Sequence, residues 1–578
     1  MKYIDLLNKI ELLDDGEEKS PFLAYNSLIE EVIKTLIRIK NSDRPIIVIK
    51  ENNYMANRFK DILASYLDEN EYALYLPEES LRSEEIATSF ENRANRLLAL
   101  YKIITNDNLK VIITSPYGYI RHLPEKDVLK NSLIHLKKDD IFDKDELVDK
   151  LKKLGYEKVL HVETPMTYAS RGYIVDLFSV NYDFPIRIEF FDNVIDSIRF
   201  FDINTQRTIE VIEEVDICFA KDVFFNEEEK VYLKENIKVE SGEEELNLEY
   251  IFNDIFRQSS YFYYAYFKKE HLKDYLDAYI YLSDEDKIRE HLKMLSDETF
   301  DYIREMHEEK KLPLKFSVFG DINRLLINED IIKGNPFKKN SSLVEEYDLP
   351  YGNVDYLLSL IDKEKYKYKL IILSDKKAKE FIDSLIKNKI EYQIFIDFLK
   401  PGINILIDYM FGGFIVKDLD LIIYTEKELL KKYKHQGRFA SRYAEARTLN
   451  SFEELNKGDY IVHDKYGIGQ YEAIETRCVN GVSLDYLKII YKGNDELLVP
   501  LSQFSLVRKY VSKDGVRPKL HKLGSKEWQE TKKRVEENVE ELAGRLIKLY
   551  ASRDGDIGFA CKEDSDLQKE FESTFIYE

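Results

Sequence analysis

Two side chains suited to protein recognition share one face of a strand predicted within PIRIEFF, residues 185–191. The strand alternation places Arg187 and Phe191 on the same face, opposite the isoleucines. A strand with one face in a core normally exposes polar side chains, so an aromatic residue beside an arginine indicates a contact surface for another protein. The alternative is that Phe191 ends the strand and lies under a turn. The surrounding stretch, residues 171–207, is β-rich.

No recognisable reaction centre accompanies this surface. The sequence contains no HExxH, GxSxG or GxxxxGK[ST] pattern. The first loop followed by a helix, residues 20–37, therefore lacks the loop that cradles phosphate, and we expect no ATP hydrolysis in this domain. The three cysteines are far apart, which excludes a sequence-visible zinc ribbon or disulfide framework. We expect no metal ion or other cofactor in this chain.

Length and charge limit the possible classes of protein. The 578 residues predict about four domains of roughly 150 residues each. A net charge of -22 disfavours a protein that wraps nucleic acid, although a local basic patch is compatible with it. The N-terminus has no apolar signal core, and no apolar run is long enough to span a bilayer. The sequence predicts a soluble cytoplasmic chain without membrane contact.

Alternating strands and helices predict a parallel α/β sheet in the first part of the chain. Expected strands are 45–50, 72–76 and 111–114, and expected helices are 53–67 and 83–100. The aromatic segment 246–282 predicts core rather than a base-stacking platform, because few basic residues are interleaved.

The second half begins with another α/β pattern and then changes character. It predicts a strand at 369–373, an N-cap at Ser374 with an amphipathic helix to residue 390, and strands at 402–408 and 419–424. Basic residues between 426 and 449 indicate a solvated linker rather than a nucleic-acid patch. Glycine turns from residue 458 predict a small twisted barrel of about five strands. A long amphipathic helix is expected from Ser525 to about Tyr550.

The order of these parts resembles the N-terminal half of the bacterial transcription-repair coupling factor family, Mfd. SRGYIVDLF, PIRIEFFDNVIDSIR and FDINTQRT resemble the domain shared with the excision-repair helicase UvrB. Residues 456–511 resemble the CarD-type domain that binds RNA polymerase, and HKLGSKEW resembles the start of the family's connector. The order in which these motifs follow one another in a single chain is more specific for the family than any one motif.

The resemblance implies a multidomain α/β architecture with seven segments. These are 1–124 and 211–345, the two parts of a degenerate UvrB-like parallel α/β domain; 125–210, an inserted α+β domain that binds UvrA; 346–425, a further small α/β domain; 426–455, a basic linker; 456–512, an SH3-like or CarD-like β-barrel; and 513–578, a long connector helix. An ATP- and Mg²⁺-dependent translocase motor would follow, and the abrupt end predicts a truncated protein.

The same resemblance assigns partners and residues. The family positions that dock on UvrA match Arg171, Arg187 and Phe191, and planar guanidinium groups suit paired hydrogen bonds to carboxylates. The barrel is expected to bind the polymerase β subunit through a strand edge. Arg477 stands where the family usually has an apolar residue, and Ile474, Val482 and Tyr486 are the surrounding candidates. Contact with double-stranded DNA is expected mainly through the absent motor.

Two other functions are compatible with parts of this pattern. One is a UvrB-like excision-repair helicase that uses ATP itself, which the missing phosphate loop disfavours. The other is a transcription regulator that acts only through the CarD-like barrel.

Overall fold

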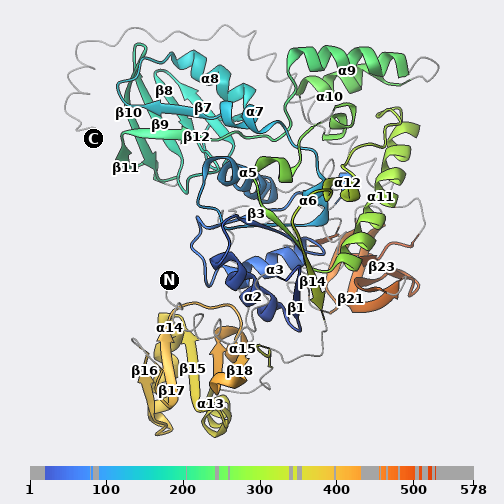
Figure 1. The fold of residues 1–578 in the computed structure, drawn as a ribbon. Helices are drawn as coiled ribbons and strands as arrows, with labels where there is room; N and C mark the ends of the chain where they lie inside the picture. The colour runs from blue at the N-terminus through green and yellow to red at the C-terminus, as the bar shows by residue number, and fades with distance from the viewer. Residues whose placement is uncertain are drawn as a thin grey trace, which may run out of the picture.

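The computed structural model describes residues 20–430 and 455–528, apart from gaps at 79, 83–89, 204, 241–245, 258–260, 268, 337–342, 348–353, 396–398, 456, 464–465, 480–481, 501–506, 511–517 and 524–527. Within these residues the chain forms several α/β units and one all-β unit (Figure 1). None of the described helices combines the length and apolar character needed to cross a membrane.

A six-stranded parallel sheet organises the first unit, in the order β1-β14-β13-β2-β4-β3. Its strands are β1 (Phe22–Tyr25), β2 (Ile46–Ile49), β3 (Tyr72–Tyr75), β4 (Val111–Thr114), β13 (Tyr279–Leu282) and β14 (Ile331–Pro336). β13 and β14 lie between β1 and β2, so two distant chain segments complete one sheet. The residues between β4 and β13 therefore form an insertion between two strands of the first sheet, and the inserted domain expected at 125–210 lies within this interval.

Helices cover both faces of this sheet, which explains its apolar strands. β2 and β4 are buried along their whole length, as strands covered on both sides must be. On one face they pack against α2 (Leu28–Lys40) and α3 (Asn53–Leu63). On the other they pack against α5 (Phe90–Thr105). The helix expected at 53–67 thus ends at Leu63, and part of the one expected at 83–100 lies outside the described residues.

The inserted domain is built on a second six-stranded sheet, ordered β11-β10-β9-β8-β7-β6. Its residues Ile186 and Ile188 share a core with Leu147 and Leu151 of α8. The elements are α7 (Lys126–Asn131), β5 (Ile134–Lys137), α8 (Lys144–Lys153), β6 (Glu157–Lys158), β7 (Thr167–Arg171), β8 (Ile174–Leu177), β9 (Ile186–Phe191), β10 (Val194–Phe201), β11 (Thr208–Ile212) and β12 (Glu214–Ile217). The predicted alternation of PIRIEFF is confirmed, and Arg187 lies on the face opposite these isoleucines.

The aromatic segment forms core, as predicted. Tyr261–Tyr264 are at most 1% exposed and lie in a short 3-10 helix, η2 (Tyr261–Tyr266). They share a core with α9 (Glu227–Glu240), α10 (Leu248–Arg257) and the long α11 (Glu285–Glu308). A second 3-10 helix, η3 (Leu272–Tyr275), and two short helices, α6 (Pro116–Ile120) and α12 (Ile322–Leu325), complete this region.

A smaller α/β unit packs against the first. Its five-stranded sheet is ordered β16-β17-β15-β19-β18, and Leu370, Ile372 and Ile423 share a core with α2. Ser374 precedes α14 as predicted, but its hydroxyl donates to Glu426 instead of capping the helix. The elements are α13 (Val354–Lys363), β15 (Tyr368–Leu373), α14 (Asp375–Lys387), β16 (Tyr392–Ile394), β17 (Gly402–Ile407), β18 (Ile415–Val416), η4 (Lys417–Leu419), β19 (Leu421–Thr425) and α15 (Glu426–Leu430).

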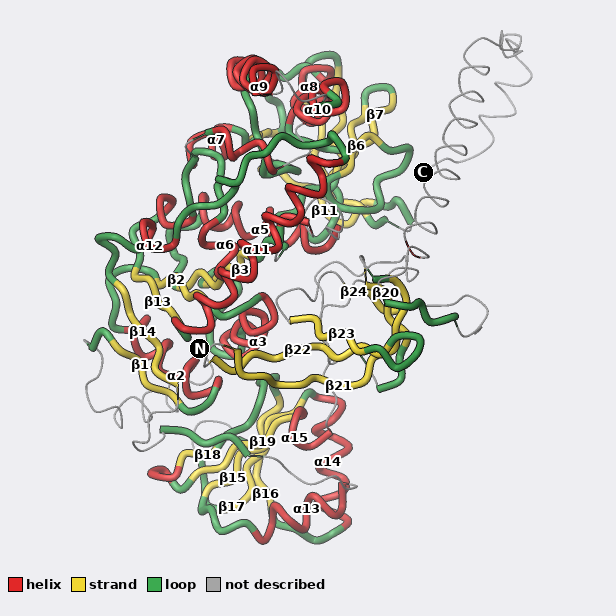
Figure 2. The backbone as a smooth tube through the Cα atoms, turned by 90° about the vertical axis from the view of Figure 1, so that its right-hand side faces the viewer, coloured by secondary structure: helices red, strands yellow, loops and turns green. Residues whose placement is uncertain are grey.

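The all-β unit is a half-barrel sheet ordered β23-β22-β21-β20-β24. It contains β20 (Tyr460–His463), β21 (Gly467–Val479), β22 (Val482–Ile490), β23 (Glu496–Pro500) and β24 (Val507–Lys509). Its long β21–β22 hairpin is visible in Figure 2. The first residues of the expected linker form α15, whereas residues 431–454 of the linker and all of the expected C-terminal helix from 525 on except Trp528 lie outside the described residues.

A buried ion cluster holds the end of the inserted domain on the first unit. Asp222 follows β12, and its Oδ2 lies 2.9 Å from Nε of Arg96 and 3.3 Å from Nη2 of Arg121. Arg93 donates to the carbonyl of Ala220 at 2.7 Å. Burial by itself would raise the pKa of Asp222, but the charges of Arg96 and Arg121 lower it to about 2. The carboxylate is therefore the ionised partner of a cationic cluster.

We expect Asp222→Ala to destabilise this junction by about 3–5 kcal/mol, because it leaves buried guanidinium charge without its partner. In the wild type, the contribution of Asp222 to the free energy of unfolding is fully present above the unfolded pKa of about 4. It should be lost as the pH falls towards the folded pKa of about 2. Urea unfolding between pH 2 and 5 measures both effects. The exposed Asp149→Ala is the matched control, and an equal loss in both variants would contradict the assignment.

Candidate partner-binding surfaces

The outer face of the inserted sheet brings together all three residues that the family resemblance assigns to its surface. In the register, Arg187 of β9 lies opposite Asp176 of β8, and Asp176 opposite Ala169 of β7. Arg171 follows on β7 two residues after Ala169, so it shares this face. Phe191 lies at the end of β9 on the same face. In the register, Arg171 lies level with Glu189 of β9, which is halfway between Arg187 and Phe191 along that strand.

One buried carboxylate holds both arginines. Asp176 is 1% exposed, and its two oxygens lie 2.7 Å from Nε and 2.9 Å from Nη2 of Arg187. Arg171 donates to the same carboxylate through Nη2 at 3.1 Å. Asp176 was not singled out from the sequence, although an acid within the apolar strand IVDL was an available signal. Its role is to fix the positions of two guanidinium groups.

The three candidate residues differ in exposure. The side chain of Arg187 is 15% exposed and lies over the ring of Phe201, 4.5 Å from its centroid. A hydrogen bond to Asp176 raises the pKa of Arg187. Arg171 is 52% exposed in its side chain, and Phe191 is 78% exposed. Phe191 therefore does not pack under a turn, and the accessible part of the surface is Arg171 with Phe191.

The next strand extends the pattern of paired charges. Arg199 of β10 lies opposite Arg187, and its guanidinium donates to Glu189 of β9. Ser197 donates to the same carboxylate at 2.9 Å. Like charges directly opposite each other on a sheet are destabilising, so the two carboxylates, Asp176 and Glu189, separate and neutralise the two arginines. The face presents ordered guanidinium groups rather than mobile ones.

The barrel hairpin brings together some of the other candidates. On β21, Arg477 is two residues from Glu475, and its guanidinium contacts that carboxylate at 2.9 Å. Tyr486 of β22 lies opposite Glu475, so it shares their face. Val482 pairs with Val479 near the hairpin tip.

Ile474 lies apart from these residues. It alternates to the opposite face and packs against the barrel core, beside Leu487. Tyr486 is half-buried, and burial together with the charge of Glu290 in α11 raises its pKa. The hairpin therefore approaches α11, as Figure 1 also shows for the neighbouring β21 and β23. Arg477, with a side chain 48% exposed, is the accessible cation of this surface.

The turn from β1 into α2 contains carboxylates where a phosphate loop would need amide groups. Ser27 caps α2 by accepting from the amide of Glu30, and the Glu30 carboxylate accepts from Asn26 at 2.8 Å. Glu31, one residue on, is buried and binds Lys50 at 2.7 Å. Burial by itself would lower the pKa of Lys50, but Glu31 and Glu51 raise it. The helix end that binds phosphate in nucleotide-binding folds is thus occupied by acidic side chains.

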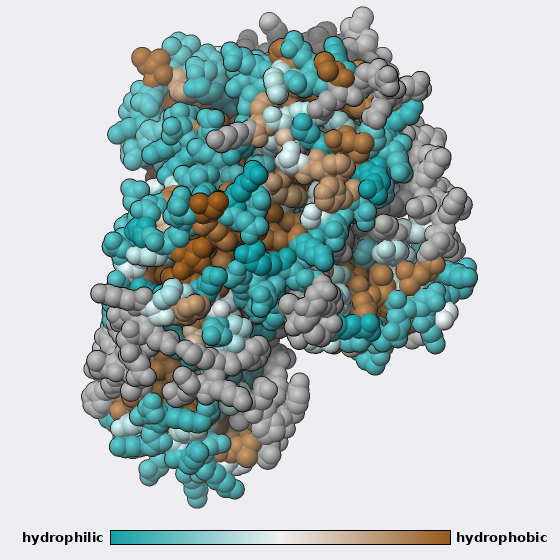
Figure 3. Space-filling view, turned by 45° about the vertical axis from the view of Figure 1, so that its right-hand side comes forward, coloured by the Kyte–Doolittle hydropathy of each residue, from teal (hydrophilic) through white to brown (hydrophobic). Residues whose placement is uncertain are grey.

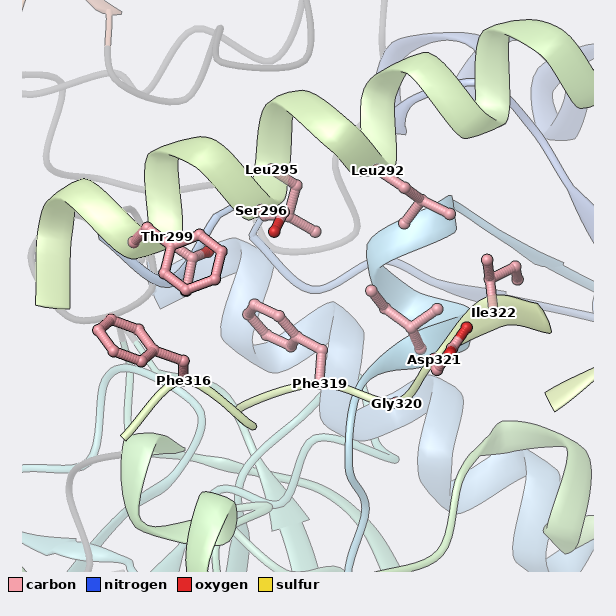
Figure 4. Close-up of a pocket in the computed structure, with 11 residues that line it drawn as sticks. Leu292, Leu295, Ser296, Thr299, Phe316, Phe319, Gly320, Asp321 and Ile322 are labelled. Atoms are coloured by element: carbon pink, nitrogen blue, oxygen red, sulfur yellow. The ribbon is translucent and has the colours of Figure 1, made fainter. Parts of the chain in front are cut away.

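A pocket between α11 and residues 316–322 is lined mostly by apolar residues, together with Ser296, Thr299 and Asp321. It has a volume of about 270 Å³, and Leu292, Leu295 and Phe319 point into it (Figure 4). Among the described lining residues Asp321 is the only titratable one, so these residues include no acid–base pair. Hydrophobic residues also gather in a band across the middle of the face in Figure 3. Among the described residues, no group of three or more His, Cys, Asp or Glu side chains could hold a metal ion.

Comparison with known proteins identifies two family domains in the chain. Residues 134–222 match the UvrB interaction domain, which includes the Asp176 face. Residues 455–511 match the CarD-like/TRCF RID domain, which includes the β21–β22 hairpin. These matches agree with the resemblance found in the sequence.

The chain is also similar to longer proteins. It is 30% identical to the transcription-repair-coupling factor of Bacillus subtilis (strain 168) over 601 residues, covering 97% of this chain and 51% of that protein. It is 29% identical to the factor of Staphylococcus aureus (strain MRSA252) and 28% identical to that of Staphylococcus haemolyticus (strain JCSC1435), in each case over 93% of this chain and 49% of the relative. The chain thus spans about half the length of the curated relatives it matches.

Asp176→Ala should destabilise the inserted domain by about 3 kcal/mol, because the largely buried Arg187 loses its partner. Asp176→Asn retains one acceptor oxygen and should therefore lower the free energy of unfolding by less than Asp176→Ala does. Urea unfolding followed by hydrogen exchange of β8 and β9 measures both. Asp196→Ala, at an exposed position of β10, is the control. If Asp176→Ala unfolds at the same midpoint urea concentration as the wild type, the shared carboxylate does not stabilise this face of the sheet.

Proposed function

We propose that this chain is the partner-binding region of a transcription-repair-coupling factor, in which the inserted domain binds UvrA and the barrel domain binds RNA polymerase. The proposal rests on two family domains in the same chain and on similarity to such factors along nearly its whole length. The observation that carries it is the face on which Asp176 holds Arg171 and Arg187 beside the exposed Phe191. A protein with both surfaces bridges a stalled polymerase to excision repair.

The UvrA surface combines an aromatic anchor with preorganised cations. Arg171 retains free donor groups beyond its single hydrogen bond to Asp176, and its side chain is half exposed. It can therefore bind a carboxylate of the partner without first losing much conformational freedom. Phe191 supplies apolar area that a partner pocket would cover. Arg187 acts mainly as a positioning residue, because Asp176 and Phe201 occupy most of its surroundings.

For the polymerase, we propose that the β subunit binds along a strand edge of the half-barrel sheet. Its end strands, β23 and β24, have one described strand neighbour each. Arg477 adds a cation near the hairpin tip, where the family usually has an apolar residue. Its guanidinium is already paired with Glu475, so binding an apolar partner surface there would require desolvating an ion pair.

The activity of the complete protein is part of the same proposal. We infer that it is an ATP-dependent translocase on double-stranded DNA, cytoplasmic, and that ATP and Mg²⁺ belong to a motor outside this chain. The carboxylates around the start of α2 support the view that the first domain does not hydrolyse ATP. The alternatives of a UvrB-like helicase and of a regulator acting only through the barrel each leave one family domain without a role.

Combining Arg171→Ala with Phe191→Ala should weaken UvrA capture by this chain by roughly thirtyfold, the effect of losing hot-spot contacts worth about 2 kcal/mol. Both side chains are accessible, so folding should be preserved. Surface-immobilised UvrA with increasing salt measures the affinity and its charge dependence. Lys153→Ala, exposed on α8, is the control. Unchanged capture by the double variant would remove the site assignment.

Arg477→Leu combined with Glu475→Leu should tighten binding of the isolated polymerase β subunit by roughly tenfold, because the strand face then has no ion pair to desolvate. Isothermal titration with the full chain measures this affinity. Lys457→Leu combined with Glu472→Leu, at an exposed ion pair of the same domain, is the matched control. Weaker binding by Arg477→Leu alone would instead identify Arg477 as a direct contact to an acidic partner group.

A further inference from the structure

The two edges of the inserted sheet are different. At one edge, β6 consists of only two residues, Glu157 and Lys158, and both are charged and exposed. At the other, β11 has five residues, and β10 is its sole strand neighbour within the described part of the chain. An edge strand presents unpaired amide and carbonyl groups to solvent. β11, at the left of Figure 1, is the longer of the two.

β11 has only one of the features with which proteins usually protect an edge, a shift in its register with β10 between Phe200 and Phe201. Its sequence, TIEVI, contains neither lysine nor proline, and four of its five residues are β-branched. Ile209 is 46% exposed and Val211 is 62% exposed. Short edges and charged side chains prevent unwanted strand pairing, as on β6. A long, β-branched, exposed edge in the same sheet is suited to receiving another strand.

The register joins this edge to the charged face. Val211 lies opposite Arg199 of β10, which in turn lies opposite Arg187 of β9. A strand added beside β11 would therefore continue the same sheet, and one of its side chains would lie beside Val211 on the face of Arg199. Ile209 lies at the register shift, where β10 offers it no partner residue, and its exposed side chain is next to the same edge. The remaining side chains of the added strand would lie beside Glu210 on the other face.

Charge selects the kind of strand. Glu210 and the following Glu213 form no ion pair with another described residue. A basic side chain opposite Glu210 is favourable, whereas a second copy of β11 is not. Full antiparallel pairing of two β11 strands would place Glu210 directly opposite its own copy, and such like-charge pairs are destabilising. The same acidic residues disfavour nucleic acid.

We propose that β11 is a strand-addition site for an extended segment of a partner protein in which apolar residues alternate with lysine or arginine. The partner strand forms main-chain hydrogen bonds with the free edge of β11. Its apolar side chains cover Ile209 and Val211, and its basic side chains pair with Glu210. The site is separate from Arg171 and Phe191, so it does not depend on the identity of the partner at that surface.

The test uses the full chain and a labelled peptide of alternating valine and lysine as the probe. We expect fluorescence anisotropy to detect binding and hydrogen exchange to slow at residues 208–212. A peptide with methylated backbone nitrogens at alternate positions, and one with glutamate in place of lysine, should each bind at least roughly tenfold more weakly. The first tests main-chain pairing and the second tests charge.

Two sets of variants complete the test. Ile209→Lys combined with Val211→Lys should reduce peptide affinity by roughly tenfold, whereas Val239→Lys, at an 80% exposed position of α9, should not. Arg171→Ala combined with Phe191→Ala, both at accessible positions, should leave peptide binding unchanged, which separates this proposal from the UvrA assignment. The proposal is overturned by equal binding of the methylated peptide, by protection outside 208–212, by absence of peptide binding, or by self-association that protects β11.

Discussion

This structure depends on ion pairs in which one buried charged side chain contacts two side chains of the opposite charge. At the junction between the inserted domain and the first unit, Asp222 meets Arg96 and Arg121. Removing water from such a group costs several kcal/mol, so it must keep its partners once buried. Because those partners come from α5 and the end of α6, the inserted domain is held in one place on the first sheet. The proposed UvrA surface is built on that fixed frame.

The same arrangement, with different chemistry, recurs at two other places. Asp176 is buried between Arg171 and Arg187, and there the excess charge is cationic and partly exposed. Lys50 is buried against Glu31 and Glu51, and there the excess charge is anionic and enclosed. The first produces ordered donors that a partner can bind. The second places carboxylates near the start of α2, which is unfavourable for a phosphate ligand.

Several features of the fold were predictable because they depend on local patterns. The apolar runs at residues 45–50 and 111–114 are buried strands, and the alternation in PIRIEFF separates a core face from an outer face. The aromatic segment around Tyr261 is core, as its lack of interleaved basic residues indicated. Boundaries were less accurate: α3 ends at Leu63, although the apolar residues Tyr66 and Leu67 beyond it pack into the same core and prolong the helical spacing in the sequence.

By itself the sequence determined which residues alternate onto a common strand face, which phosphate-binding motif is missing, and which family order the domains follow. Those properties depend on residues that follow one another in the sequence. Only the tertiary structure decided that Arg171, from another strand, shares a carboxylate with Arg187, and that Ile474 faces the barrel core while Arg477 faces outward. It also decided that β11 is an edge. Strand register and strand order depend on contacts between distant segments, which no local pattern contains.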